Sequence, residues 1–476
     1  MPNHQRTIEA LSAIVGPTAC LTEPSDTQGY TTDYRKMYRG LAIAVVLPST
    51  TDEVSQVVTW CHANGVKIVP QGGNTSLMGG SVPDGAGDAI ILNLRRMARV
   101  LAIDTLNDTM TLQAGVTLSS ARTSADQAER LFPLRIGSEG SCQIGGNIAT
   151  NAGGTAVLRY GNMRDLVLGI EAVLPDGQIY SSLRGLRKDN TGYDLKQLFI
   201  GSEGTLGIIT AAVLKLMPRP QAATAAFVAV RSPAAAVELL GLAKKMAGPT
   251  VTAFELVSSD AMNLVCEYLS NATPPLQGQP AWMVLVEFTS TGSQDLLESS
   301  MVQVLELGIE NGLINDAAIA SSLSDVQAFW RLREEISDAQ TRAGGSIKCD
   351  VSVPLSSIAN FIDEAYKAVK TMAPESRMVI YGHMGDGNVH FNPLRPAQQD
   401  AKEYLMAHYE SISNTVDGLV HSLNGSISAE HGIGVAKRDD LLKYKSSVEL
   451  GLMWQVKKAL DPQNLLNPGK LLPSLA

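Results

Sequence analysis

The sequence predicts an α+β fold in at least two domains, with a boundary near residue 219. From about residue 40 to residue 218, short β-branched runs alternate with glycine-dense loops, which is typical of strands joined by tight turns. After Pro218 and Pro220 the pattern changes to longer strand–helix alternation, which favours a compact α+β domain. With 476 residues, 45% of them hydrophobic, the chain is long enough for two or three separate cores.

Charge and cysteine usage exclude several classes of protein. The 38 Lys and Arg against 47 Asp and Glu give a formal net charge of -9, which argues against nucleic acid or an anionic membrane as a partner. The five cysteines lie far apart without a C-x-x-C pair, which indicates reduced, buried thiols rather than disulfides or a metal cluster.

The first sixteen residues have charges inside an apolar pattern and predict an amphipathic helix rather than a signal peptide. No stretch approaches the roughly 18 apolar residues that cross a bilayer. We therefore expect a cytoplasmic protein without a transmembrane segment.

Two further patterns predict a hairpin in the first domain and helices near the C-terminus. LGIEAVLPDGQIY predicts a β-hairpin that turns at Pro175-Asp176-Gly177. Near the C-terminus, residues 403–423 and 448–460 have helical apolar spacing and flank the loop SISAEHGIGVAKRDDL.

Glycine-rich loops in the first domain indicate a phosphate-containing ligand. Gly72-Gly73 and Gly79-Gly80 follow the predicted strand VKIVP, where backbone N–H groups can approach a pyrophosphate closely. Three further loops, within residues 137–140, 145–146 and 201–207, favour an extended nucleotide, although each loop alone could be a structural turn.

The familiar nucleotide motifs are incomplete. Gly385-Asp-Gly387 has His390 where the dinucleotide fingerprint requires its third glycine, and Gly469-Lys470 is followed by leucine rather than Ser or Thr. The sequence therefore argues against NAD on a Rossmann domain and against ATP on a P-loop.

Several motifs together resemble a known family. PQGGNTSLMGGSVP, GSEGSCQIGGNIATNAGG and GSEGTLGIIT resemble the FAD-binding domain of the vanillyl-alcohol-oxidase superfamily. In the C-terminal half, GHMGDGNVHFN, SAEHGIGVAKR and DPQNLLNPGK are similar to the FAD-linked D-2-hydroxyacid dehydrogenases. The resemblance covers nearly the whole chain.

The resemblance implies a domain organisation. Residues 1–218 would form a two-subdomain FAD-binding domain, and residues 219–420 a ferredoxin-like antiparallel cap that binds substrate. Residues 421–476 would form a short C-terminal helical segment that completes the active site, and the flavin would lie in the cleft between domain and cap.

The resemblance also implies the flavin contacts. FAD should be bound non-covalently, because the first loop lacks the histidine through which some superfamily members attach it. The expected contacts are Pro70, Gly72, Gly73, Asn74, Thr75, Ser81, Gly137, Ser138, Gly145, Asn147 and Ile208.

The stretch YGHMGDGNVHFN contains two of the seven histidines in the chain. If Asp386-Gly387 forms a two-residue type I′ turn, His383 and His390 face each other on one face of the hairpin. Their Cβ atoms would then lie roughly 5 Å apart, which suits two imidazoles that share one divalent metal. The alternative is that these polar side chains serve only packing.

A third ligand is needed, and Glu430 in SAEHG is the best-placed carboxylate. Two histidines and one carboxylate would leave coordination positions open for substrate. The resemblance implies metal ligands at His383, His390 and Glu430 and a general base at His431, which as a neutral imidazole can accept the substrate hydroxyl proton. We expect zinc; manganese, iron and cobalt also suit these ligands.

Substrate recognition requires cations. Arg333, in the predicted helix DVQAFWRLREEISDAQ, would share a face with Trp330 and Ser337 and bind a carboxylate. The alternative is an ion pair of Arg333 with Glu334 or Asp338 on a solvated face.

A second cation stands in IKCDVSVP, where Lys348, Asp350 and Ser352 alternate onto one face. A Lys at this position is similar to the pattern of the D-2-hydroxyglutarate dehydrogenases, whereas D-lactate dehydrogenases of the same fold tend to lack it. A second cation would suit a substrate with a second carboxylate. A Lys348–Asp350 ion pair is the alternative. Asn392, near the histidines, completes the expected substrate-binding residues.

The predicted function is FAD-dependent oxidation of a D-2-hydroxy dicarboxylate, D-2-hydroxyglutarate or D-malate, to the 2-oxo acid. The alternatives are a D-lactate or glycolate dehydrogenase of the same fold, a flavin-free metallohydrolase, and a silent nucleotide-binding protein. The expected electron acceptor is external, either electron-transfer flavoprotein or a quinone-linked carrier. A homodimer is an open alternative to a monomer.

Overall fold

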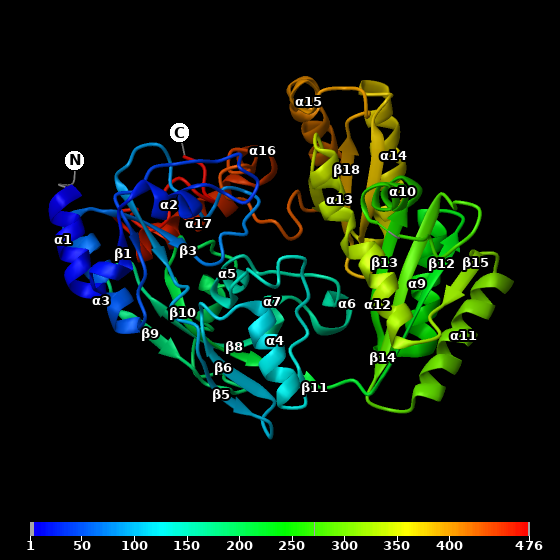
Figure 1. The fold of residues 1–476 in the computed structure, drawn as a ribbon, viewed down its shortest axis with the longest axis horizontal. Coiled ribbons are helices and arrows are strands. Elements are labelled where there is room, and N and C mark those ends of the chain that lie inside the picture. The colour runs from blue at the N-terminus through cyan, green and yellow to red at the C-terminus, as the bar shows by residue number, and fades with distance from the viewer. Residues whose placement is uncertain (1–3, 271, 475–476) are drawn as a thin grey trace. The chain divides into compact units, whose positions relative to one another are not determined.

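The computed structural model describes residues 4–270 and 272–474 and shows two compact units. Unit 1 comprises Met1–Gly153, Asn162–Pro218 and His431–Ala476, and unit 2 comprises Gly154–Gly161 and Arg219–Glu430. In Figure 1 the main body of unit 2 runs from green to orange, and the C-terminal part of unit 1 is red. Residues 421–476, expected as one segment, are therefore divided after Glu430.

Unit 1 contains two main sheets. The first has the order β1-β2-β4-β3, with β2, β4 and β3 parallel, and the second is antiparallel with the order β5-β6-β10-β8-β9. The strands are β1 (Cys20–Leu21), β2 (Val45–Val46), β3 (Lys67–Gln71), β4 (Ala89–Asn93), β5 (Val100–Asp104), β6 (Thr109–Gln113), β7 (Arg130–Leu131), β8 (Val167–Val173), β9 (Ile179–Ser182), β10 (Ile208–Lys215) and β11 (Met217–Pro218).

The helices of unit 1 cover these sheets and cap their ends. The predicted N-terminal helix is confirmed as α1, which buries Thr7, Leu11 and Val15. The helices are α1 (His4–Val15), α2 (Pro24–Thr31), α3 (Thr51–Asn64), α4 (Leu118–Gln127), α5 (Ile144–Ala149), α7 (Met163–Leu166), α8 (Lys196–Phe199), α16 (Leu441–Tyr444) and α17 (Ser447–Leu460).

The predicted hairpin at residues 168–180 is confirmed as β8 and β9. Val173 pairs with Ile179, and Gly177 has a φ of 90° in the turn between them. Glycine is suited to this left-handed conformation because it has no Cβ.

The C-terminal residues are built into the first sheet of unit 1. Ile68 in β3 receives a backbone hydrogen bond from Asn467 and donates one to Leu465. The buried Lys457 ammonium lies 2.5 Å from the Asp461 carboxylate and donates to two backbone carbonyls. A buried charge is tolerated only when it is paired in this way, so this ion pair anchors the chain end beside β3.

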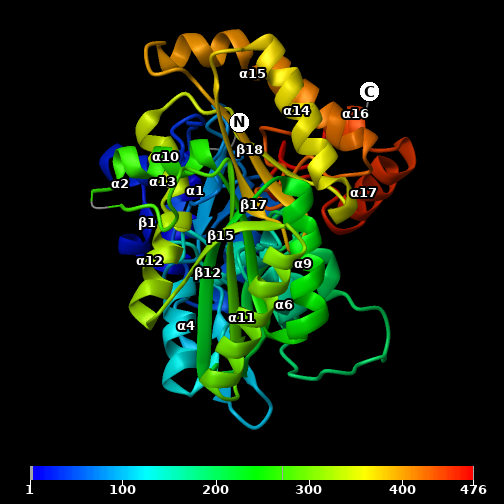
Figure 2. The same cartoon turned by 90° about the vertical axis from the view of Figure 1, so that its right-hand side faces the viewer.

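Unit 2 is built on one antiparallel sheet with the order β15-β12-β14-β13-β17-β18-β16 (Figures 1 and 2). Its first four strands, numbered in chain order, have the order 4-1-3-2 of a ferredoxin-like fold, which confirms the predicted cap. The strands are β12 (Ala222–Val230), β13 (Val251–Ser258), β14 (Trp282–Ser290), β15 (Ile314–Ile319), β16 (Cys349–Ser352), β17 (Arg377–His383) and β18 (Asn388–Leu394).

Helices pack against the sheet of unit 2, so its central strands are almost entirely buried. One core joins β12, β13, β14 and β17 to the helices α10, α12 and α13, and α14 and α15 lie side by side (Figures 1 and 2). The helices are α6 (Val157–Tyr160), α9 (Pro233–Ala247), α10 (Ser259–Tyr268), α11 (Gln294–Glu310), α12 (Leu323–Glu334), α13 (Ile336–Ala343), α14 (Ile358–Met372) and α15 (Ala401–Ser422).

Two further observations concern membrane-spanning helices and the cysteines. No helix among residues 4–270 and 272–474 is long and apolar enough to span a bilayer. All five cysteines are free thiols, and four of them are buried.

Candidate active site and nucleotide-binding loops

The hairpin of β17 and β18 carries both predicted metal-ligating histidines. The expected register is wrong, because the chain turns over residues 384–387 and Tyr381 rather than His383 lies opposite His390. A type I′ turn requires positive φ at both central residues, and within this turn only Gly387 has it. The register differs from the expected one by two residues, so the histidines still share one face of the sheet.

The two imidazoles converge on one carboxylate. The Glu430 Oε2 atom lies 3.6 Å from His383 Nε2 and 3.8 Å from His390 Nε2. Ligands of a tetrahedral zinc, at 2.0–2.1 Å from the metal, lie roughly 3.4 Å from one another. All three residues belong to unit 2, and their spacing fits a single ion.

A second carboxylate stands behind each histidine. Glu255 in β13 is the direct cross-strand partner of His383, and its two oxygens lie 2.9 and 2.8 Å from His383 Nδ1. Asp350 in β16 is the cross-strand partner of His390, with its Oδ1 atom 3.5 Å from His390 Nδ1. Contacts at Nδ1 leave Nε2 of both rings directed to Glu430, as in carboxylate–histidine–metal arrangements.

Asp350 also organises its surroundings. Its Oδ1 accepts from the Asn388 amide at 2.9 Å, and its Oδ2 accepts from the Glu430 backbone N–H at 2.8 Å. The predicted alternation is confirmed for Asp350 and Ser352, which lie opposite His390 and Asn388, whereas Lys348 lies before β16.

Burial and the neighbouring carboxylates shift the pKa values of both histidines. Burial would lower the pKa of His383, but the carboxylates of Glu255 and Glu430 outweigh it and hold that pKa well above its usual range. Burial lowers the pKa of His390 to about 3, against the opposing pull of Asp350 and Glu430. Near neutral pH the pair therefore carries one positive charge, on the His383 imidazolium.

Arg333 lies in α12 and is buried rather than solvated. Its Nη2 atom is 2.7 Å from Glu255 Oε2, and its guanidinium carbon is 4.7 Å from the centre of the Tyr381 ring. The alternative, an ion pair with Glu334 or Asp338 on a solvated face, is wrong, because Arg333 is buried and pairs with Glu255.

Ser337 does not share the face of Arg333. The predicted single helix is interrupted at Glu335, between α12 and α13, and Ser337 in α13 is exposed whereas Arg333 is buried. The common face expected at i and i+4 is therefore wrong, and a substrate contact for Ser337 stays a prediction.

Lys348, Asn392 and His431 are the other residues predicted for this region. Lys348 is half-buried directly before β16, and the buried Asn392 accepts from the Cys349 N–H at 3.0 Å. His431 directly follows Glu430 and is the first residue of the C-terminal part of unit 1.

In unit 1, the predicted flavin loop after β3 is folded by its own side chains. Asn74, at a left-handed φ of 54°, donates to the carbonyls of Gly29 and Thr32 and accepts from the Ser81 hydroxyl at 2.8 Å. Pro70, the residue before the end of β3, packs against Gly204, where an added Cβ would lie 3.2 Å from the proline ring.

The first glycine loop touches the second. A Cβ added to Gly73 would lie 1.9 Å from the Ser141 carbonyl oxygen, and one added to Gly72 would contact the Gln143 side chain at 3.5 Å. Gly145 packs equally tightly, with an added Cβ only 2.8 Å from the Ala114 Cβ. At Gly73 and Gly145 the loops are therefore packed too closely for a side chain.

The other predicted flavin contacts fall in the same part of unit 1. Gly137 and Ser138 lie in the turn before α5, where the Ser138 carbonyl accepts from the Cys142 N–H, and Asn147 lies in α5. Thr75 is half-buried in the first loop, and Ile208 begins β10 opposite Val173.

Comparison with known proteins identifies the family. The FAD binding domain family matches residues 42–182, and the family of FAD linked oxidases, C-terminal domain, matches residues 219–471. This chain belongs to the FAD-linked oxidases. It contains both characteristic parts of that family in one polypeptide.

Among curated relatives of this FAD-linked oxidase is the mitochondrial D-2-hydroxyglutarate dehydrogenase of Arabidopsis thaliana, which is 37% identical over 97% of this chain and 80% of the relative. A D-2-hydroxyglutarate–pyruvate transhydrogenase of Saccharomyces cerevisiae is 35% identical over 94% of this chain and 90% of the relative. The fold resembles p-cresol methylhydroxylase with a TM-score of 0.79, at 18% identity over 98% of this chain and 96% of that one. The fold is thus of the vanillyl-alcohol-oxidase type.

The loops of unit 1 fit the FAD that this family binds. Two buried acceptors, Gln143 Oε1 and Asn467 Oδ1, have no hydrogen-bond partner within the described parts of the chain. Asn467 also donates to the carbonyls of Gly80 and Glu203 and so ties the first loop to a third glycine loop. Unused acceptors beside glycine loops suit a ligand with hydroxyl and N–H donors.

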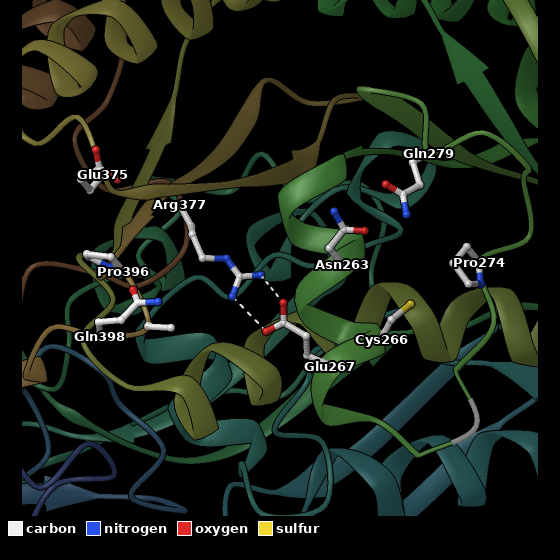
Figure 3. A pocket seen from close by; sticks show the side chains of 10 residues that line it. Asn263, Cys266, Glu267, Pro274, Gln279, Glu375, Arg377, Pro396 and Gln398 are labelled. Atoms are coloured by element: carbon white, nitrogen blue, oxygen red, sulfur yellow. Dashed lines mark hydrogen bonds and ion pairs between the residues drawn. The ribbon is translucent and has the colours of Figure 1, made fainter.

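The surface hollow in Figure 3 is unrelated to the predicted site. It lies in unit 2 between α10, the start of β17 and residues 396–398, and Arg377 crosses it to bind Glu267 through two hydrogen bonds of 2.9 Å. Arg377 and His383 stand at opposite ends of β17, about 20 Å apart at strand spacing.

The tight approach of the first two loops predicts that Gly73→Ala disrupts flavin binding. Its Cβ would meet the backbone oxygen of Ser141, which cannot move without displacing the second loop. We expect the purified variant to retain less than about a tenth of the FAD absorbance, since distortion of a preformed site costs a few kcal/mol. Gly85→Ala is the matched control, because a Cβ there meets none of the described atoms within 4 Å. Full flavin content in Gly73→Ala would show that the loop does not form the site.

Proposed function

We propose that the protein oxidises a D-2-hydroxy dicarboxylate, D-2-hydroxyglutarate first and D-malate next, to the 2-oxo acid with FAD as the hydride acceptor. The observation that supports this most strongly is the 37% identity, over 97% of this chain, to a protein named D-2-hydroxyglutarate dehydrogenase. The converging His383, His390 and Glu430 side chains, with Arg333 held nearby through Glu255, support it independently.

In this proposal, two cationic residues bind the substrate and a histidine accepts its proton. Arg333 and Lys348 bind the two substrate carboxylates, because Arg333 lies beside Glu255, the partner of His383, and Lys348 directly precedes the strand that carries Asp350. His431 accepts the hydroxyl proton as the general base. FAD supplies the hydride chemistry when bound.

His383, His390 and Glu430 would hold a divalent metal, zinc first. Three carboxylates, those of Glu255, Asp350 and Glu430, surround the histidines, and Arg333, Lys348 and the protonated His383 oppose them in this proposal, so 3 − 3 leaves no net positive charge. Such a cluster does not attract a dianionic substrate unless more positive charge is added. A divalent ion would supply that charge and lower the pKa of a bound hydroxyl.

The decisive experiment is anaerobic reduction of the bound flavin by a panel of 2-hydroxy acids. We expect D-2-hydroxyglutarate to bleach the flavin absorbance fastest, D-malate next, and the L-enantiomers not at all. Faster reduction by D-lactate or glycolate would favour the monocarboxylate alternative. A colourless protein that hydrolyses substrates would favour the metallohydrolase.

Replacement of Lys348 tests the dicarboxylate specificity. We expect Lys348→Ala to lower kcat/KM for D-2-hydroxyglutarate by about 10- to 100-fold, the loss of a charged hydrogen bond of about 1.5–3 kcal/mol. Residual turnover of D-lactate, which has no second carboxylate, should change less than about threefold. The control is Lys367→Ala on the exposed side of α14. Equal losses on both substrates would contradict this role for Lys348.

The pKa values of the histidines predict proton release on metal binding. At about pH 7, His383 retains a proton because its pKa is raised well above the usual value, whereas His390, with a pKa of about 3, is already neutral. A metal titration followed with an indicator dye should therefore release about one proton per ion.

The sign of the pH dependence follows. Metal affinity should be highest above the raised pKa of His383 and fall about tenfold for each pH unit below it, since the ion then competes with a proton. His383→Ala should remove this dependence. Affinity that is constant across neutral pH would contradict the assignment of His383 as a ligand.

The electron acceptor stays a prediction. Electron-transfer flavoprotein and quinone-linked carriers are the expected classes, and the name of the yeast relative adds pyruvate. Reoxidation of the reduced flavin by each of them under anaerobic conditions separates these possibilities.

A further inference from the structure

Glu255 is the charged residue of an otherwise uncharged strand. β13 has the sequence VTAFELVS, all eight of its residues are buried, and Glu255 is only 1% exposed. An unpaired carboxylate in such a position would cost several kcal/mol. Its partners therefore explain why the fold tolerates it.

These partners come from two different elements. His383 in β17 lies directly opposite Glu255 in the sheet, with Nδ1 within 2.9 Å of both carboxylate oxygens. Arg333 in α12 approaches from the helix layer and places Nη2 2.7 Å from Oε2. One buried carboxylate thus contacts both a metal ligand and a substrate-binding cation of the proposed function.

We propose that Glu255 is a positioning residue that aligns His383 for metal binding and Arg333 for substrate binding at the same time, so that the two events are coupled. The carboxylate at Nδ1 directs His383 Nε2 towards Glu430, 3.6 Å away. The same carboxylate holds the guanidinium, whose other face lies against the Tyr381 ring at 4.7 Å. This inference rests on the proposed function.

The other histidine also has a carboxylate behind it. Asp350 stands behind His390, and its oxygens accept from the Asn388 amide and the Glu430 N–H. These partners are a residue of β18 and the backbone of a proposed metal ligand. Glu255 differs because its second contact reaches Arg333 on a helix, so a change there should affect both metal and substrate.

The chain contains a matched control for the burial of charge. Glu287 in β14 is 8% exposed and lies on the same face of the sheet, because it pairs with Ala253, two residues before Glu255. Its Oε1 accepts from the Trp330 Nε1 at 2.7 Å, in the same helix that carries Arg333. Glu287→Gln therefore perturbs a similar environment without touching the histidines.

The experiment compares Glu255→Gln with Glu287→Gln in the full-length FAD-loaded protein. Flavin absorbance reports folding, competition with a chromophoric chelator reports zinc affinity, and steady-state kinetics with D-2-hydroxyglutarate reports kcat and KM. We expect Glu255→Gln to bind zinc about 10- to 100-fold more weakly, the usual effect of losing a carboxylate behind a metal-bound histidine.

Saturating zinc separates the effect of Glu255→Gln on metal binding from its effect on substrate binding. It should restore most of kcat in Glu255→Gln but leave KM about tenfold or more above that of the wild-type protein, because Arg333 has lost its partner. Glu287→Gln should stay within about twofold in both quantities. If Glu255 had a purely structural role, Glu255→Gln and Glu287→Gln would lose flavin, zinc affinity and activity to a similar extent. That result would overturn the proposal.

A second variant covers the case in which Glu255→Gln does not fold. Glu255→Asp keeps the buried charge but is one methylene shorter, so it cannot reach His383 and Arg333 together. We expect zinc affinity or KM to worsen by at least about fivefold. Wild-type values of both in Glu255→Asp would overturn the proposal.

The outcomes also separate this inference from the proposed function. A wild-type protein that binds no zinc, or that does not oxidise D-2-hydroxyglutarate, would contradict the proposed function itself. A wild-type protein that does both, with Glu255→Gln equal to it in zinc affinity and KM, would contradict the role of Glu255 alone.

Discussion

The ion pair between Glu255 and its two partners is the constraint on which the candidate site depends. A carboxylate in the middle of a buried strand is unstable unless positive or hydrogen-bonding groups meet it there. His383 and Arg333 meet this requirement from a neighbouring strand and from a helix. The positions of these two side chains are therefore constrained by the need to compensate one buried charge, and a strand and a helix hold them more accurately than loops would.

The nucleotide loops of unit 1 follow a different principle, in which the backbone and not a charge is the limiting element. Gly73 and Gly145 stand where an added Cβ would collide with backbone or with a neighbouring side chain. Asn74 and Ser81, expected as flavin contacts, also fold the first loop through their own hydrogen bond. The residues that are expected to contact the flavin thus also set the shape of the loop.

The sequence predicted which residues share a face better than which residues touch. His383 and His390 lie on one face because strand side chains alternate, and this holds in either register. The register itself was predicted wrongly, because the turn depends on packing: a Cβ on Gly387 would lie 2.4 Å from the Val353 carbonyl oxygen. Periodicity within one strand contains no information about that distant carbonyl.

Glu255 was missed for a related reason. Its partner His383 is 128 residues away in the chain, so the contact depends on strand order, which a motif does not reveal. The available signal was the lone acid in VTAFELVS, since charged residues are rarely buried unless they are paired. Ser337 shows the opposite error, because helical spacing alone could not reveal the interruption at Glu335.

Two histidines and a glutamate are chemically ambiguous, since the same three ligands serve hydrolases and dehydrogenases. The family of the chain and its loops favour the dehydrogenase. Glycine loops with buried, unused acceptors such as Gln143 Oε1 and Asn467 Oδ1 suit the FAD that this family binds. The buried Arg333 beside Glu255 is a cation of the kind that pairs with a carboxylate. An FAD-linked dehydrogenase of an acidic substrate would use both, because it must hold the substrate in one orientation while the cofactor takes up the hydride.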